Sequence, residues 1–427
     1  MRLLFIADGR SPIALNWIRY FVEQGHAVHL VSTYPCDVDL ELASLRFAPV
    51  AFSGLQGKRD KDPGNRDLGT REQDRQSQRF GHEGRRREGL WGARAVGTRT
   101  AFRHWLGPLT LGGTAERLRG IIDQVRPELV HAMRIPYEGM AAALAGPQAP
   151  LLVSVWGNDF TLHAPSTPLM RHYTHLALER SAGLHTDCQR DVRLARAWGL
   201  PDDRPVIVLP GGGGVQLEAF YPPDSIIESG GDGVQLETSY PPVSITKGDF
   251  TVINPRGIRA YVCNEAFFRA IPKVLQRLPG TRFSCIGMVD EPQALRWLDE
   301  LGIAGNVRLL PKYTRLQMGD LFRQSQVVVS PSTHDGTPNT LLEAMACGCF
   351  PVAGDIESLR EWITPGVNGL LVNPADPQDL AHAIIFALER GDLRRRGRVY
   401  NLELVARRAE HSQVMRHAEQ FYRDLIP

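Results

Sequence analysis

Residues 327–352 read VVVSPSTHDGTPNTLLEAMACGCFPV, and this stretch decides the fold. It begins with a short apolar run typical of a buried strand, Val327–Ser330, and has the apolar spacing of a helix over Asn339–Cys347. Thr337 or Asn339 is expected to cap that helix, and Gly348 to end it. A helix that begins just beyond the carboxyl end of a strand presents free N–H groups and a positive dipole end. The pattern therefore predicts a phosphate or diphosphate site.

Two carboxylates lie in this predicted phosphate site. Asp335 follows the strand, and Glu343 lies one turn inside the helix. A carboxylate repels phosphate, but it accepts two hydrogen bonds from a vicinal diol, so ribose and hexose hydroxyls are its sensible partners. The alternative for Glu343 is a surface position, although its apolar neighbours Leu342 and Met345 favour a buried or cleft one.

A complementary pair of cations is expected at the end of another strand. Thr251–Asn254 is apolar enough to be a strand, and Arg256 and Arg259 follow it. Ligands bind at the carboxyl ends of strands in open parallel sheets, and arginine suits bidentate phosphate contact. A lone arginine here would be a surface residue, but two at this position favour phosphate binding.

Short apolar runs alternate with helical patterns on both sides of this motif. In the first half the predicted strands are Arg2–Ala7, Ala27–Ser32, Leu129–Ala132 and Leu151–Trp156, and the predicted helices are Ile13–Gln24, Ala115–Val125 and Glu138–Ala145. In the second half the further strands are Thr281–Ile286, Val307–Leu310 and Phe350–Ala353, with helices over Asn264–Leu278, Glu291–Leu301, Arg315–Gln324, Ile356–Trp362, Asp376–Glu389 and Leu393–Leu425. This alternation predicts the α/β class, with two Rossmann-like domains whose parallel sheets face each other across a cleft.

Two segments interrupt the alternation. Residues 56–89 are rich in charge and poor in large apolar side chains, so we expect a disordered or loosely ordered insertion. Residues 213–223 recur as 232–242, which is either a linker that tolerates insertion or, as we favour, a slippage duplication without a role. The expected division is a first domain over 1–209, a Gly/Pro-rich linker over 210–248, a second domain over 249–392, and a final helix over 393–427 that returns to the first domain.

Composition excludes several classes of protein. The 427 residues carry a formal net charge of +2, which gives no reason to expect a nucleic-acid partner. No window approaches the apolar length of a spanning helix, and the six cysteines lack disulfide or metal-ligand spacing. We therefore expect a cytoplasmic protein. The basic run Arg85–Arg87 is compatible with peripheral contact at the inner face of the membrane, but a solvated insertion is the simpler interpretation.

The motif of two acidic residues eight positions apart resembles the retaining, GT-B-fold glycosyltransferases of family 4, also called glycosyl transferases group 1. It reads Asp335-Gly336, then Glu343-Ala-Met-Ala-Cys-Gly348, then Pro351-Val352. Weaker similarities are Asp8-Gly-Arg-Ser-Pro12, Trp156-Gly-Asn-Asp159, Glu361 and Asn368-Gly-Leu-Leu-Val372. The resemblance covers nearly the whole chain apart from 56–89 and the duplicated linker. It implies a nucleotide-diphosphate sugar as donor, bound by the second domain, and an acceptor of unknown identity on the first domain.

The resemblance also implies roles for single residues. Glu343 would bind the ribose hydroxyls, Asp335 the transferred sugar, and Arg256 the diphosphate, with Arg259 as a second cation. The backbone from Gly336 through Thr340 and Leu341 to Leu342 would lie near the diphosphate, which Gly9 of the first loop would approach from the other domain. His131 would lie near the reacting sugar. The catalytic set would thus be Asp335, Arg256 and His131.

Three departures from the family pattern are visible. Asp335 stands where glutamate is usual, Tyr261 where lysine is common, and Trp156 where histidine is common. The implied reaction is front-face transfer with retained anomeric configuration, in which the diphosphate takes the acceptor proton. No cofactor or metal is expected, because Asp37-Val-Asp39 lies in a polar loop and His163, His172 and His175 are loosely spaced. Two alternatives remain open: a nucleotide-sugar epimerase or hydrolase on the same fold, and a catalytically inactive nucleotide-sugar-binding protein.

Overall fold

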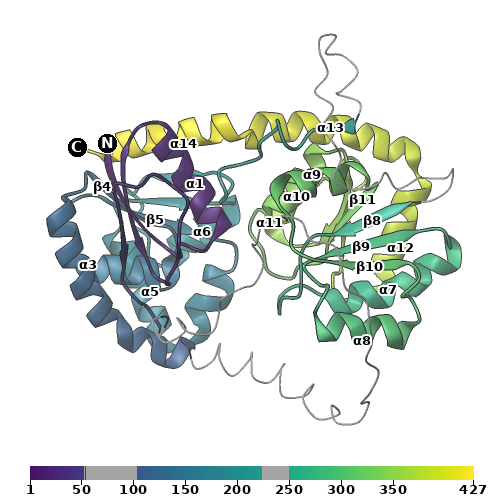
Figure 1. Ribbon diagram of the computed structural model, residues 1–427, viewed down its shortest axis with the longest axis horizontal. Helices are drawn as coiled ribbons and strands as arrows, with labels where there is room; N and C mark the ends of the chain where they lie inside the picture. The colour runs from purple at the N-terminus through teal and green to yellow at the C-terminus, as the bar shows by residue number, and fades with distance from the viewer. Residues whose placement is uncertain (52, 54–102, 224–249) are drawn as a thin grey trace, which may run out of the picture.

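The computed structural model describes residues 1–51, 53, 103–223 and 250–427, which form two α/β domains side by side (Figure 1). The expectations about the insertion at 56–89, its basic run and the second copy of the duplication at 232–242 concern residues outside these ranges. Each domain contains one sheet, and all strand pairs in both sheets are parallel. The predicted α/β class with two Rossmann-like domains is confirmed.

The N-terminal sheet has seven strands in the order β3-β2-β1-β4-β5-β6-β7. Their bounds are β1 Arg2–Ala7, β2 Ala27–Ser32, β3 Ser44–Phe47, β4 Leu129–Ala132, β5 Leu151–Val155, β6 Gly183–Thr186 and β7 Val206–Val208. The central strands β4 and β5 are buried along their whole length, because helices cover both faces of the sheet.

The helices of this domain form two layers. They are α1 Pro12–Glu23, α3 Leu111–Val125, α4 Met140–Ala145, α5 Pro168–Arg180 and α6 Gln189–Ala197, with the short helices η2 Gly107–Thr110, η3 Ile135–Gly139, η4 Asp159–His163 and η5 Ala164–Ser166. One apolar cluster joins the sheet to α3, α4 and α5. A second cluster joins its other face to α1 and to the last helix of the chain, α14 His411–Leu425.

The C-terminal sheet has six strands in the order β10-β9-β8-β11-β12-β13. The strands are β8 Thr251–Asn254, β9 Arg282–Ile286, β10 Val307–Leu310, β11 Val327–Ser330, β12 Phe350–Gly354 and β13 Leu370–Val372. The helices are α7 Asn264–Arg277, α8 Pro292–Leu301, α9 Arg315–Arg323, α10 Asn339–Ala346, α11 Glu357–Arg360, α12 Pro377–Glu389 and α13 Gly391–Ala409. Helices α7, α8 and α12 share one apolar cluster with the sheet, and α9, α10 and α13 share another.

The prediction of one continuous helix over Leu393–Leu425 is wrong. The chain is extended at Glu410 (φ −63°, ψ 129°), which separates α13 from α14. The Glu410 carboxylate then accepts hydrogen bonds from the backbone N–H groups of Ser412 and Gln413, both at 2.8 Å, and so caps α14. The two helices run along the upper edge of both domains and bring the C-terminus back beside the N-terminus (Figure 1).

The segment that follows β7 is not a loose linker in its described part. Val215, Ala219 and Phe220 are buried in the apolar cluster of the C-terminal domain. The Val215 N–H donates to Ala409 O at 2.6 Å, and the His411 N–H donates to Val215 O at 2.9 Å. The two places where the chain passes between the domains are therefore hydrogen-bonded to each other.

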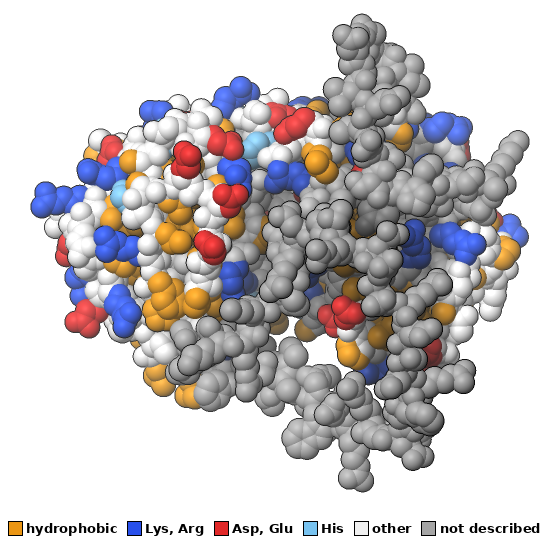
Figure 2. All heavy atoms as spheres, in the orientation of Figure 1, with side chains coloured by type: hydrophobic (Ala, Val, Ile, Leu, Met, Phe, Trp, Pro, Cys, Tyr) orange, Lys and Arg blue, Asp and Glu red, His pale blue; other side chains and the backbone are white. Residues whose placement is uncertain are grey.

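The surface view agrees with the near-neutral composition. Acidic and basic side chains are interspersed over the described part of the face in Figure 2, and no region of one sign dominates the N-terminal domain there. Among the described residues, no helix is long and apolar enough to cross a membrane.

Candidate active site

Helix α10 begins without the predicted side-chain cap. Pro338 occupies the N-cap position, and neither Thr337 nor Asn339 caps the helix. The Thr337 hydroxyl is buried and instead donates to the carbonyl oxygen of Asp187 in the other domain, while it accepts a hydrogen bond from Trp362 Nε1 at 3.0 Å. The expected cap is thus used to join the two domains.

The N–H groups open to a ligand are fewer than predicted. The Leu341 and Leu342 N–H groups both donate to Pro338 O, at 2.9 and 3.3 Å, and both side chains are buried in the core. These two N–H groups are therefore already hydrogen-bonded within the helix start. Asn339 Oδ1 and Thr340 Oγ1 are buried and have no hydrogen-bond partner among the described residues, so the open polar groups concentrate in the first turn.

The structure brings Arg256 and Asp335 together as an ion pair at the ends of β8 and β11. Their side chains are 10% and 16% exposed. Arg256 is positioned by its own N–H, which donates to Asn254 Oδ1 at 3.0 Å, and Asn254 is in turn held by Asn264, also at 3.0 Å. Arg256 Nε is buried and unpartnered among the described residues. A cation, a carboxylate and an uncapped helix start therefore lie in one place.

Glu343 is half-buried on α10. Burial raises its pKa to about 7, while the positive charge of Arg315 on α9 acts in the opposite direction. Among the described residues, no group donates a hydrogen bond to its carboxylate. Arg315 is engaged with Asn16 of α1, at 2.6 Å, and with Gln216. Glu343 thus keeps its acceptor capacity for a ligand.

Three predicted residues lie apart from this group. Arg259 is exposed and donates to the Tyr261 hydroxyl at 2.9 Å. Gly9 is buried in its own domain, where its N–H donates to Ser32 Oγ at 3.0 Å and where Cys36 and Ser32 leave no room for a Cβ. The structure therefore explains the glycine by packing rather than by an approach to phosphate.

The third is His131, which the resemblance places near the reacting sugar and which the structure buries in the N-terminal sheet. It is 1% exposed and lies in β4, where Nε2 contacts Ser154 Oγ at 2.7 Å and Nδ1 contacts the Tyr422 hydroxyl of α14. Burial lowers its pKa well below the ordinary value. His131 joins the sheet to the returning C-terminal helix, so its role in the described structure is packing.

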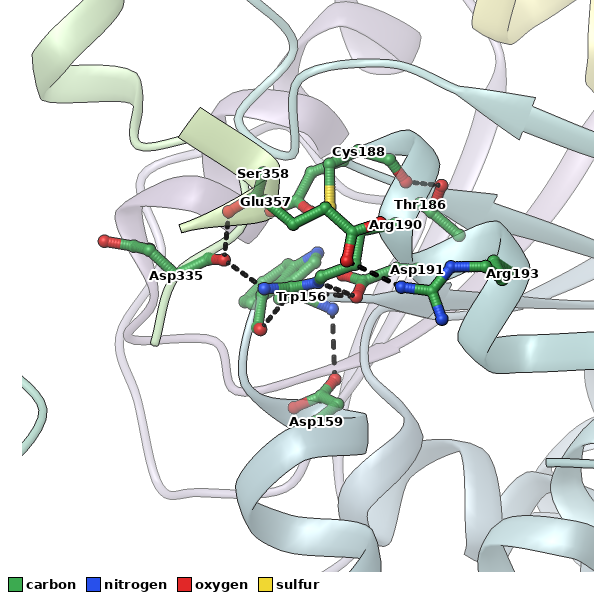
Figure 3. Close-up of polar contacts among 12 residues, drawn as sticks. Trp156, Asp159, Thr186, Cys188, Arg190, Asp191, Arg193, Asp335, Glu357 and Ser358 are labelled. Atoms are coloured by element: carbon green, nitrogen blue, oxygen red, sulfur yellow. Dashed lines mark hydrogen bonds and ion pairs between the residues drawn. The ribbon is translucent and has the colours of Figure 1, made fainter. Parts of the chain in front are cut away.

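A residue that the sequence analysis missed reaches this site from the N-terminal domain. Arg190, at the start of α6, donates from Nη1 to Asp335 O at 2.8 Å and from Nη2 to Gly157 O at 2.5 Å (Figure 3). Its guanidinium also pairs with Asp191 at 2.8 Å, and Ser358 Oγ donates to the same Asp335 carbonyl at 2.7 Å. The available signal was its position just after a strand, at the carboxyl edge of the sheet.

Gly157 and Gly336 allow the two domains to approach this closely. A Cβ on Gly157 would overlap the backbone at Asp335 and Gly336, and a Cβ on Gly336 would overlap the Asp187 carboxylate. Burial and the nearby charges of Asp191 and Asp335 raise the pKa of Asp187 well above its ordinary value. The loop before α10 is therefore in close contact with the N-terminal domain.

Two further contacts extend this junction. Glu361 accepts hydrogen bonds from the N–H groups of Gln189 and Arg190, at 3.0 and 3.1 Å, so a carboxylate of one domain caps α6 of the other. Arg193, one turn further along α6, pairs with Glu357 at 2.6 Å near the surface. Glu361, noted in the sequence only as part of a motif, thus has a structural role.

One group of three potential metal ligands occurs in the described part of the chain: Asp187, Cys188 and Asp191. Arg190 already balances the charge of Asp191, and burial raises the pKa of the Cys188 thiol. These potential metal ligands are therefore arranged around the Arg190 guanidinium. The histidines noted in the sequence do not converge either: His163 contacts His104 at 3.0 Å, whereas His175 packs on Trp198.

Comparison with known families agrees with this geometry. Residues 9–212 match the glycosyl transferase 4-like domain, and residues 263–390 match the glycosyl transferases group 1. Together the two matches span most of both domains, and the chain belongs to the group 1, family 4 glycosyltransferases with the GT-B fold.

Individual relatives are more distant. D-inositol 3-phosphate glycosyltransferase of Mycolicibacterium smegmatis is 33% identical over 120 residues, which cover 27% of this chain and 28% of the relative. The enzyme of that name from Geodermatophilus obscurus is 39% identical over 93 residues, 22% of this chain and 21% of the relative. The matched segments thus span under a third of these relatives' length.

Solved structures match over the whole chain. HepE of Anabaena, crystallised with UDP, superposes with a TM-score of 0.67 at 14% identity and covers 99% of this chain and 100% of its own. Sucrose-phosphate synthase from Thermosynechococcus elongatus superposes with a TM-score of 0.69 at 16% identity, over 100% of this chain and 99% of its own. At these identities the likeness establishes the fold.

Proposed function

We propose that the protein transfers a sugar from a nucleotide-diphosphate sugar to an acceptor hydroxyl, with retention of the anomeric configuration. The observation that carries the proposal is the uncapped start of α10, whose unpartnered Asn339 and Thr340 side chains accompany the Arg256–Asp335 pair. Unsatisfied buried polar atoms are uncommon in folded proteins, and a diphosphate sugar supplies partners for all of them.

Each group has a separate task in this proposal. The first turn of α10 and Arg256 hold the diphosphate, and the half-buried Glu343 carboxylate accepts hydrogen bonds from the ribose diol. Because Arg256 now pairs with Asp335, donor binding would exchange that partner for the diphosphate and leave Asp335 to bind the transferred sugar.

The chemical step follows from this arrangement. The acceptor oxygen attacks the anomeric carbon on the face from which the diphosphate departs, the carbon–oxygen bond to the diphosphate breaks, and the leaving diphosphate takes the acceptor proton. The growing negative charge is stabilised by Arg256 and the positive end of α10. Arginine and helix dipole supply this charge, so we propose that transfer needs no metal. Activity should survive treatment with a chelator.

The experiment that tests the proposal is nucleotide release from a panel of nucleotide sugars, with and without acceptor. UDP sugars are the first choice, because HepE was crystallised with UDP and with UDP-glucose. Release that requires an acceptor, with an unchanged anomeric configuration of the product by NMR, supports the proposal. Release to water favours a hydrolase, a changed sugar still bound to the nucleotide favours an epimerase, and binding without release favours an inactive binding protein.

A further inference from the structure

A separate cavity of about 340 Å³ lies in the N-terminal domain, at the carboxyl ends of β1, β2, β4 and β5. Its walls include three arginines, two carboxylates and three aromatic rings: Arg10, Arg103, Arg134, Asp8, Glu138, Tyr34, Tyr137 and Trp156. The volume suits a compact molecule, and the arginines and carboxyl groups on the walls disfavour a lipid tail.

Two guanidinium groups approach a single tyrosine ring in this cavity. The Arg10 guanidinium carbon lies 3.8 Å from the centroid of the Tyr34 ring, and that of Arg103 lies 5.6 Å from the same centroid. Asp8 balances Arg10 through hydrogen bonds of 3.0 and 3.1 Å. Arg103 forms no ion pair with a carboxylate of the described residues, and its Nε is buried without a hydrogen-bond partner among them.

The other titratable groups of the cavity do not neutralise the positive charge of Arg103. Arg134, which also lines the cavity, is paired with the buried Asp159 at 2.8 Å. Glu138 accepts a hydrogen bond from Thr33 at 2.8 Å, and burial raises its pKa, which disfavours its charged form. Burial also lowers the pKa values of His104 and His163, the latter to about 2, so this contacting pair is neutral.

Arg103 is held in position by a strained neighbour. Tyr137 has φ +70° and ψ −55°, a conformation rare for a residue with a side chain, and the Arg103 guanidinium lies 4.6 Å from the centroid of its ring. The Tyr137 hydroxyl donates to Arg103 O at 2.8 Å. Such strain is kept where the surrounding structure determines one position, as in a binding site.

We infer that this cavity binds the acceptor, and that the acceptor is a small polyol carrying a phosphate or carboxylate group held by Arg103 and Arg10. The inference rests on the proposed function for its assignment as the acceptor. The remaining rings and carboxyl groups suit the polyol part, because carboxyl oxygens accept hydrogen bonds from hydroxyls whether or not the group is ionised, and ring faces pack on C–H groups.

Calorimetry on protein saturated with UDP tests the inference. The probes are glucose, glucose monophosphate and glucuronate, and myo-inositol with its monophosphate. We expect at least one anionic probe to bind ten-fold or more tightly than its neutral counterpart. Arg103→Gln should abolish that difference and leave UDP affinity unchanged. Arg171→Gln is the matched control, because Arg171 also lies over a ring, that of Trp198 at 5.4 Å, but does not line the cavity.

Two results would overturn the inference: no anionic probe binds more tightly than its neutral counterpart, or Arg103→Gln retains the difference. If Arg103→Gln does not fold, Arg10→Gln provides the same comparison. Failure of every nucleoside diphosphate in a panel to bind would instead contradict the proposed function, and the same titrations on ligand-free protein would still test the cavity for anion binding.

Discussion

The proposed diphosphate site of the C-terminal domain and the cavity of the N-terminal domain occupy equivalent places, at the carboxyl ends of parallel strands, yet they are built differently. The first is mostly one continuous stretch, the loop after β11 and the start of α10, joined by Arg256. The second collects its lining from several separate segments between Ala7 and His163. A site formed by one strand and the helix after it can therefore be predicted from a sequence motif. A site formed by residues that are far apart in the chain cannot.

The largest effect on stability is expected at the junction between the two domains. Arg190 is almost fully buried and contacts both domains, and its removal would leave Asp191 as a buried charge without its partner. Loss of one member of a buried ion pair costs about 3–5 kcal/mol. We therefore expect Arg190→Met to lower the free energy of unfolding by that amount in urea titrations. An unchanged unfolding midpoint would show that the junction contributes little to stability.

The next largest effect concerns turnover in the C-terminal site. Arg256→Met removes a cation from the position where negative charge would develop, and loss of one such group typically reduces kcat about 100- to 1000-fold. Steady-state rates with a UDP sugar measure this. Arg259→Met is the matched control, because Arg259 lies on the same loop but is exposed and should change kcat only slightly. Equal losses in both variants would mean that the loop as a whole, not Arg256, matters.

Nucleotide affinity separates the two carboxylates of the same site. Hydrogen bonds to a charged group contribute about 1.5–3 kcal/mol, so Glu343→Ala should weaken UDP binding roughly 10- to 100-fold. Asp335→Ala should not weaken UDP binding, because it frees Arg256 for the diphosphate, and it should reduce turnover of the intact donor, because Asp335 would bind the sugar. Calorimetry with UDP measures the first effect. If Glu343→Ala binds UDP as tightly as the wild type, the ribose assignment is wrong.

The pH dependence of UDP binding provides a smaller test of the same residue. Burial raises the pKa of Glu343 to about 7, and a ribose diol that donates to the carboxylate favours its ionised form. UDP affinity should therefore rise roughly ten-fold from about pH 6 to pH 8. UDP also titrates in this range, so the contribution of Glu343 is the difference between wild type and Glu343→Gln. Identical pH profiles of the wild type and Glu343→Gln would contradict the assignment of Glu343 to the ribose.

In the ligand-free protein, the raised pKa of Glu343 makes the stability of the fold decrease as the pH rises, whereas UDP affinity increases. A carboxyl group whose pKa is higher in the folded than in the unfolded state stabilises the fold below its unfolded pKa, near 4.5. That contribution is lost as the pH rises toward about 7. Ligand binding should therefore offset a stability cost that Glu343 imposes at neutral pH.

The sequence predicted the fold class and the elements around Asp335 better than it predicted the N-terminal cavity. The strand before Asp335, the helix after it and the Arg256 position are local patterns, and each was found where expected. The prediction of a side-chain cap for α10 was wrong because the Thr337 hydroxyl donates across the domain junction to Asp187 O. A local sequence pattern cannot predict such a long-range contact. The packing of His131 could not be predicted, because its surroundings include Tyr422, which lies 291 residues further along the chain.

The smallest expected effect lies on the same helix as the largest. Arg193 pairs with Glu357 across the junction at 2.6 Å, but the two side chains are 64% and 52% exposed. Water and salt screen such a pair, and exposed ion pairs contribute about 0.2–1 kcal/mol. Arg193→Met should therefore change the free energy of unfolding by less than about 1 kcal/mol, and less again in high salt, which urea titrations at two salt concentrations would measure. If Arg193→Met costs as much as Arg190→Met, docking of α6 as a whole, and not the buried contact of Arg190 with Asp335 and Gly157, holds the two regions together.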